Sequence, residues 1–125
     1  IFKILKIFTY YMNILYIYLL HLLFVGPLFM YVGLRRYKTP NYLYSLLFWL
    51  GIIVLLYHAY KFYTAYKNDF INHVNIYHIL LVGPLLIYIG YQKEETDYVY
   101  FDLLTIFGLG LVGHFAFKTY KILNV

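Results

Sequence analysis

Four long stretches of apolar residues, separated by short polar ones, dominate the sequence. They cover about residues 11–34, 41–60, 75–91 and 98–117. A transmembrane helix needs about 20 mostly apolar residues, so the pattern predicts four transmembrane helices. Apolar and polar residues do not alternate along these stretches, which disfavours a β-barrel. The predicted fold is therefore an all-α membrane protein, and the short loops favour antiparallel neighbours.

The first ten residues differ from the four predicted spans because they place two lysines, Lys3 and Lys6, among apolar residues. Such a segment is typical of a helix that lies in the membrane interface, and we interpret residues 1–10 in this way. Tyrosines flank the predicted turns and helix ends, as expected of an aromatic belt at the headgroup level. The chain starts with Ile1, which is compatible with a missing N-terminal piece.

The chain contains an internal repeat. Residues 21–33 read HLLFVGPLFMYVG and residues 78–90 read HILLVGPLLIYIG, and eight of these thirteen positions are identical. The repeat predicts one membrane domain over residues 1–125, built from two tandem helical hairpins over residues 11–67 and 75–121. Each hairpin crosses the membrane twice, so both copies enter it in the same sense. Their pseudo-two-fold axis should then lie along the membrane normal.

Glycine and proline recur at matching positions of the two copies and predict close helix packing. Small residues let helix backbones approach one another in membranes, and proline removes one backbone donor and bends a helix. The predicted packing residues are Gly26, Gly33, Gly51, Gly83, Gly90, Gly108, Pro27 and Pro84. Gly110 and Gly113 extend the predicted close-packing region of the fourth helix.

Composition and charge narrow the class of protein. Hydrophobic residues make up 64% of the chain and charged residues 12%, about half the charged share of a soluble domain. The ten lysines and arginines are scattered, so a nucleic-acid surface is not expected. There is no cysteine, which excludes disulfides and thiolate chemistry. Six of the ten basic residues fall on the side of the membrane that is predicted to hold both termini. By the positive-inside rule, this favours cytoplasmic termini.

Four of the five histidines fall one in each predicted span: His21, His58, His78 and His114. Counted from the connecting turns, all four lie at a similar depth. Imidazoles that face one another across a helix bundle can ligate haem b iron or a transition metal. His21 and His78 share the same repeat register, so they are the favoured axial pair of such a site. In the same alignment His58 matches Phe115, one residue away from His114, which weakens a symmetric four-histidine site.

The favoured interpretation is nevertheless that the histidines are interfacial residues without a ligand and that no cofactor is bound. No C-x-x-C-H motif, nucleophile motif or phosphate-binding loop is present. The short predicted turns also leave little room for an active site outside the membrane. We therefore expect a structural or interaction role in a membrane rather than catalysis. The expected partners are the lipid bilayer, further copies of the chain or other membrane proteins. A small cytochrome-like or metal-binding membrane protein is the alternative function.

Amino-acid usage adds one resemblance. Tyrosine, phenylalanine, isoleucine, asparagine and lysine are abundant, whereas alanine occurs only at Ala59, Ala65 and Ala116. This bias is typical of an AT-rich genome. Together with the doubled H-x-L-x-V-G-P-L-x-x-Y-x-G motif, it resembles the small uncharacterised multi-pass membrane proteins of giant DNA viruses. The resemblance implies a component of a viral or infected-cell membrane, and the bias alone also fits an organelle genome or a low-GC cell. It assigns no functional residue.

Overall fold

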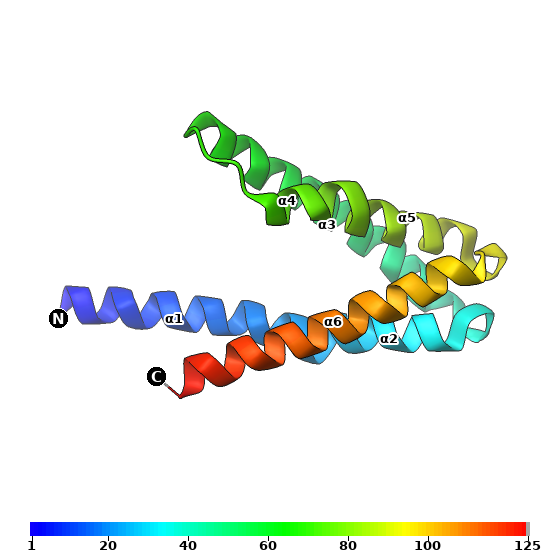
Figure 1. Cartoon of the computed structure of the whole chain (residues 1–125), viewed down its shortest axis with the longest axis horizontal. Helices are drawn as coiled ribbons and strands as arrows, with labels where there is room; N and C mark the ends of the chain where they lie inside the picture. The colour runs from blue at the N-terminus through cyan, green and yellow to red at the C-terminus, as the bar shows by residue number, and fades with distance from the viewer. Residues whose placement is uncertain (125) are drawn as a thin grey trace. The chain divides into compact units, whose positions relative to one another are not determined.

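The computed structural model describes residues 1–124, and within them the chain forms helices and turns without any strand (Figure 1). Four helical segments are long and apolar enough to cross a membrane: Phe2–Lys38, Asn41–Lys67, His73–Glu95 and Tyr98–Leu123. The predicted all-α fold with four long apolar helices is therefore confirmed.

Two of the four segments change their helical type along their length. The first consists of α1 (Phe2–Leu20), the π-helical turn η1 (His21–Val25), α2 (Gly26–Arg35) and the 3₁₀ turn η2 (Arg36–Lys38). The third consists of α4 (His73–Tyr77), the π-helical turn η3 (His78–Val82), α5 (Gly83–Gln92) and the 3₁₀ turn η4 (Lys93–Glu95). The other two are the single helices α3 (Asn41–Lys67) and α6 (Tyr98–Leu123). The internal repeat is thus visible in the order of the elements.

The helix at the start of the chain is longer than the sequence indicates. Residues 1–10 do not form a separate element, because α1 runs on from Phe2 into the first apolar stretch without a break. The whole segment has 37 residues, well above the roughly 20 that cross a bilayer. The interfacial position of residues 1–10 stays a prediction.

The chain divides into two compact units. The first combines residues 1–34 with α6 from Asp102 onward, and the second spans Arg35–Phe101. The first unit contains the Gly-Pro helix of the first repeat copy and the second helix of the second copy. The second unit contains the Gly-Pro helix of the second copy, packed on α3 of the first. Each unit therefore combines helices from different copies of the repeat.

Buried side chains occupy equivalent positions of the two copies. Those with little or no exposed surface form the pairs Leu28 and Leu85, Phe29 and Leu86, Val32 and Ile89, Tyr44 and Phe101, and Leu47 and Leu104. Two threonines in the turns, Thr39 and Thr96, are also buried and equivalent. The repeat in the sequence is therefore a repeat of the core, and not merely of composition.

Both Gly-Pro helices contain a π-helical turn directly before the glycine. In these turns the Gly26 N–H donates to the His21 carbonyl, and the Gly83 N–H donates to the His78 carbonyl, five residues earlier. A π-turn widens the helix just where the proline ring would otherwise crowd the preceding turn. The sequence predicts a bend at each proline, but it does not reveal this form of local structure.

Candidate functional site

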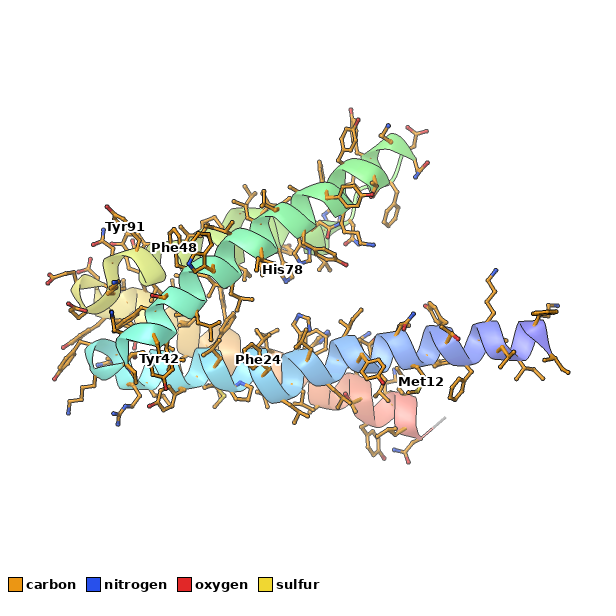
Figure 2. All side chains as sticks on the ribbon, turned by 180° about the vertical axis from the view of Figure 1, so that it is seen from behind. Met12, Phe24, Tyr42, Phe48, His78 and Tyr91 are labelled. Atoms are coloured by element: carbon orange, nitrogen blue, oxygen red, sulfur yellow. The ribbon has the colours of Figure 1, made fainter. Side chains whose placement is uncertain are left out.

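A cluster of three polar side chains lies in the second unit. The imidazoles of His58 on α3 and His78 on η3 stack with 3.9 Å between ring centroids and 19° between planes. His78 points from its π-turn toward α3 (Figure 2). His58 Nδ1–H donates to Asn75 Oδ1 over 2.8 Å, and Asn75 is only 6% exposed. Stacking and hydrogen bonding therefore hold α3 against the start of the third segment.

The first unit has an equivalent ring stack, made by different residues. His21 on η1 stacks on Phe115 of α6 with 4.6 Å between ring centroids and 23° between planes. Tyr18 also contacts Phe115, at 5.6 Å between ring centroids. His114, an exposed residue, lies edge-on to the same phenylalanine. Three aromatic side chains therefore gather around Phe115.

The two clusters correspond residue by residue under the repeat. His21 matches His78, Phe115 matches His58, and Tyr18 matches Asn75. The ring stack is common to both units, whereas the buried asparagine and its histidine partner occur only in the second. Sequence reasoning missed Asn75, since a single asparagine near a helix start is usually a cap. The alignment of His58 with Phe115 was a signal that the two histidines of α3 and α6 differ in their surroundings.

In both histidines of the Gly-Pro motif, Nδ1 faces a backbone carbonyl oxygen. His21 Nδ1–H donates to the Ile17 carbonyl over 2.8 Å, and His78 Nδ1–H donates to the Val74 carbonyl over 2.7 Å. Each acceptor lies four residues before its histidine, one helical turn away. A histidine whose Nδ1 is occupied in this way presents Nε2 as its basic nitrogen, as metal-ligating histidines do.

The stacked pair in the second unit does not fit a shared metal ion. An imidazole nitrogen lone pair lies in the ring plane, and the planes of His58 and His78 are nearly parallel and face to face. Two such lone pairs run side by side and do not converge on one ion or on the two faces of a haem. Within residues 1–124, no group of three or more histidine, aspartate or glutamate side chains is placed to hold a metal. The haem or metal assignment to His21 and His78 stays a prediction.

Four of the predicted packing glycines lie where another chain segment approaches too closely for a side chain. A Cβ on Gly90 would come 2.5 Å from the Phe48 nitrogen, and one on Gly51 would come 2.9 Å from the Ile87 nitrogen. In the first unit, a Cβ on Gly108 would come 2.9 Å from the Gly26 oxygen, and one on Gly26 would come 2.7 Å from Val112. These glycines allow the backbones of paired helices to meet.

Three further glycines show what the sequence left open. A Cβ on Gly83 would come 3.0 Å from the His78 carbonyl oxygen of the π-turn. Gly83 thus leaves room for the widened turn as well as for Leu55 on α3. Gly110 and Gly113 were expected to pack closely, but a Cβ on either would meet nothing within 4 Å. That part of the prediction is wrong, since these two glycines face away from the contact that Gly108 makes.

Turns η2 and η4 contact each other in the second unit. Tyr37 stacks on Tyr98, and the Arg36 guanidinium lies 4.7 Å from the centre of the Tyr98 ring. The buried Tyr44 hydroxyl donates to the Arg36 carbonyl over 2.6 Å. Arg36 and Lys93, equivalent under the repeat, both have positive φ, at 54° and 55°. Aromatic contacts that the sequence did not indicate therefore join the two turns.

Comparisons with known proteins identify no relative for this chain: no protein-family model, no curated protein and no solved structure matches it.

Proposed function

We propose that the protein is a multi-pass integral membrane protein with a structural or interaction role. The observation that carries the proposal is the exposure of its apolar helices. In the most apolar window of each span, no more than 33% of the residues are buried within the chain. Apolar surface of this extent is unstable in water and requires lipid or protein around it.

The packing within each unit supports a structural rather than a catalytic role. The glycines, the ring stacks and the buried pairs of equivalent residues all join one helix to another. The exposed faces carry large apolar side chains such as Trp49, Ile53 and Ile106, which suit contact with lipid or with other apolar helices. The resemblance in composition adds a viral or organellar membrane as the setting that we propose.

Cysteine labelling tests the membrane topology directly, because the chain has no cysteine of its own. Lys38→Cys lies in the first turn and Asp69→Cys between the second and third segments. In sealed vesicles an impermeant maleimide should label one position from outside and the other only after the membrane is opened. Ile53→Cys, in the middle of α3, is the control that should stay unlabelled in both. Equal labelling of Lys38→Cys and Asp69→Cys from one side would exclude the four-span topology.

The second candidate function is a haem or metal protein that uses His21 and His78. It is favoured by the Nδ1–H hydrogen bonds of both histidines to backbone carbonyls, an arrangement that orients the ring in many metal-ligating histidines. Purified protein would then show a Soret band, or about one metal ion per chain by elemental analysis. His21→Ala and His78→Ala should each remove that signal, whereas His73→Ala should not. A colourless, metal-free protein that folds normally would exclude this candidate.

A further inference from the structure

Residues 2–13, the N-terminal arm, form the part of the first segment that a bilayer core does not need. The last apolar residue before the arginines of the first turn is Leu34, and twenty residues counted back from it reach Leu15. About 20 helical residues span the hydrocarbon core. If Leu34 marks one boundary of the hydrocarbon core, the other boundary lies near Leu15, and the arm lies outside the core. All residues from Ile1 to Tyr11 are exposed.

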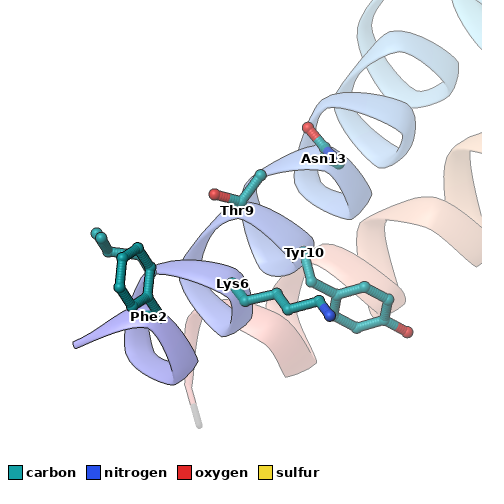
Figure 3. Close-up of a pocket in the computed structure, with 6 residues that line it drawn as sticks. Phe2, Lys6, Thr9, Tyr10 and Asn13 are labelled. Carbon is teal, nitrogen blue, oxygen red and sulfur yellow. The ribbon is translucent and has the colours of Figure 1, made fainter.

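The arm has one polar side and one apolar side. At 3.6 residues per turn, Lys3, Lys6, Thr9, Tyr10 and Asn13 fall within an arc of about 120°. Figure 3 shows Lys6 running along the helix toward Tyr10. The opposite side carries Ile4, Ile7 and Phe8, which are 71%, 55% and 62% exposed. An amphipathic helix of this type is stable where its apolar side meets acyl chains and its polar side meets headgroups.

The charge of the arm selects the kind of headgroup. Lys3 and Lys6 are its charged residues, and the first acidic residue of the whole sequence is Asp69. A shallow, mostly apolar groove runs along this part of the helix, and it is lined by Phe2, Leu5, Lys6, Thr9, Tyr10 and Asn13 (Figure 3). A mostly apolar groove suits the start of an acyl chain, and the neighbouring lysine ammonium groups suit the lipid phosphate.

We propose that the N-terminal arm binds the headgroup layer of a membrane that contains anionic phospholipid, with Lys3 and Lys6 on the lipid phosphates. The inference rests on the membrane insertion proposed above. The arm is too long to stand upright within the headgroup layer, so it lies at an angle to the bilayer normal with Ile4, Ile7 and Phe8 on the acyl side.

Amide hydrogen exchange of the full chain in lipid nanodiscs tests the proposal. One set of discs contains phosphatidylcholine alone, and the other also contains phosphatidylglycerol. We expect the anionic lipid to slow exchange in residues 2–13 and to leave the four spans unchanged. A lysine near an anionic surface contributes about fivefold in affinity. Lys3→Gln with Lys6→Gln should therefore reduce the added protection of the arm by about thirtyfold. Lys61→Gln with Lys67→Gln is the control of equal charge change and should keep the protection.

Each alternative has its own result. Equal exchange of the arm in both discs, or a difference that survives the loss of Lys3 and Lys6, would overturn the proposal. Protection induced by inorganic phosphate in phosphatidylcholine discs would overturn it in favour of a free anion. Protection that depends on the number of chains per disc would overturn it in favour of a second copy. Fast exchange in the four spans in both discs would instead refute the membrane insertion itself.

Discussion

The imidazole of His58 stacks on that of His78 at 3.9 Å, at the position where Phe115 stacks on His21 in the other unit. The same contact is therefore made once by two histidines and once by a histidine and a phenylalanine. The difference is coupled to Asn75, a buried residue that accepts the His58 hydrogen bond and has Tyr18 as its equivalent.

His58→Phe should preserve the ring stack but leave the side-chain oxygen of Asn75 without the hydrogen bond from His58. An unsatisfied buried polar group costs about 1–3 kcal/mol, and we expect the free energy of unfolding to fall by that amount. His58→Phe combined with Asn75→Leu removes both polar partners and should recover most of the loss. Unfolding in mixed detergent micelles measures both variants. A double variant less stable than the single one would contradict this account of the cluster.

Gly90→Ala should destabilise the second unit, because the new Cβ would come 2.5 Å from the Phe48 nitrogen and 2.7 Å from its Cα. Backbone atoms cannot move aside locally, so α3 and α5 must separate. Overpacking of this kind costs about 1–3 kcal/mol. Gly110→Ala is the matched control, since a Cβ there meets nothing and alanine favours a helix by up to about 1 kcal/mol. Thermal unfolding in detergent should lower the midpoint for Gly90→Ala only.

Tyr44→Phe should cost about 1 kcal/mol of stability, the usual net value of one hydrogen bond. The hydroxyl of Tyr44 donates to the Arg36 carbonyl, which also accepts from the Thr39 N–H and so keeps one partner. Phenylalanine already fills the equivalent position, at Phe101. Tyr42→Phe, at a side chain that is 71% exposed, should leave the unfolding midpoint unchanged. Equal effects of the two variants would remove the role assigned to this hydrogen bond.

Lys93→Gly should stabilise the turn between α5 and α6. Lys93 has φ 55° and ψ −128°, a conformation that glycine adopts without the steric cost that a Cβ imposes. The gain should be about 1 kcal/mol, since positive φ costs other residues roughly 1–2 kcal/mol. The control is Lys61→Gly inside α3, about two turns before its end, where glycine should destabilise the helix by a similar amount. A higher unfolding midpoint for Lys93→Gly and a lower one for Lys61→Gly would support a steric cost at Lys93. A lower midpoint for Lys93→Gly would contradict it.

Local properties of the sequence predicted the helical class, the four apolar segments and the correspondence of the two copies. Helix length follows from runs of apolar residues, and the repeat follows from comparing residues 21–33 with 78–90. The close packing at Gly26, Gly51, Gly90 and Gly108 agrees with the usual role of small residues in apolar helices. Gly110 and Gly113 do not pack in this way, because composition alone does not tell which side of a helix meets a neighbour.

The sequence by itself therefore determined the elements and their equivalence, and the tertiary structure decided which elements meet. It brings α3 against the third segment, so that His58 meets His78 and Asn75, and it places Phe115 rather than His114 on the ring of His21. It also turns the bend expected at each proline into a π-turn. The physical reason is the range of the interactions along the chain. Helix formation and apolar character are set by near neighbours in the chain, whereas helix pairing depends on how complete faces fit, and one residue of rotation, about 100°, changes the partner.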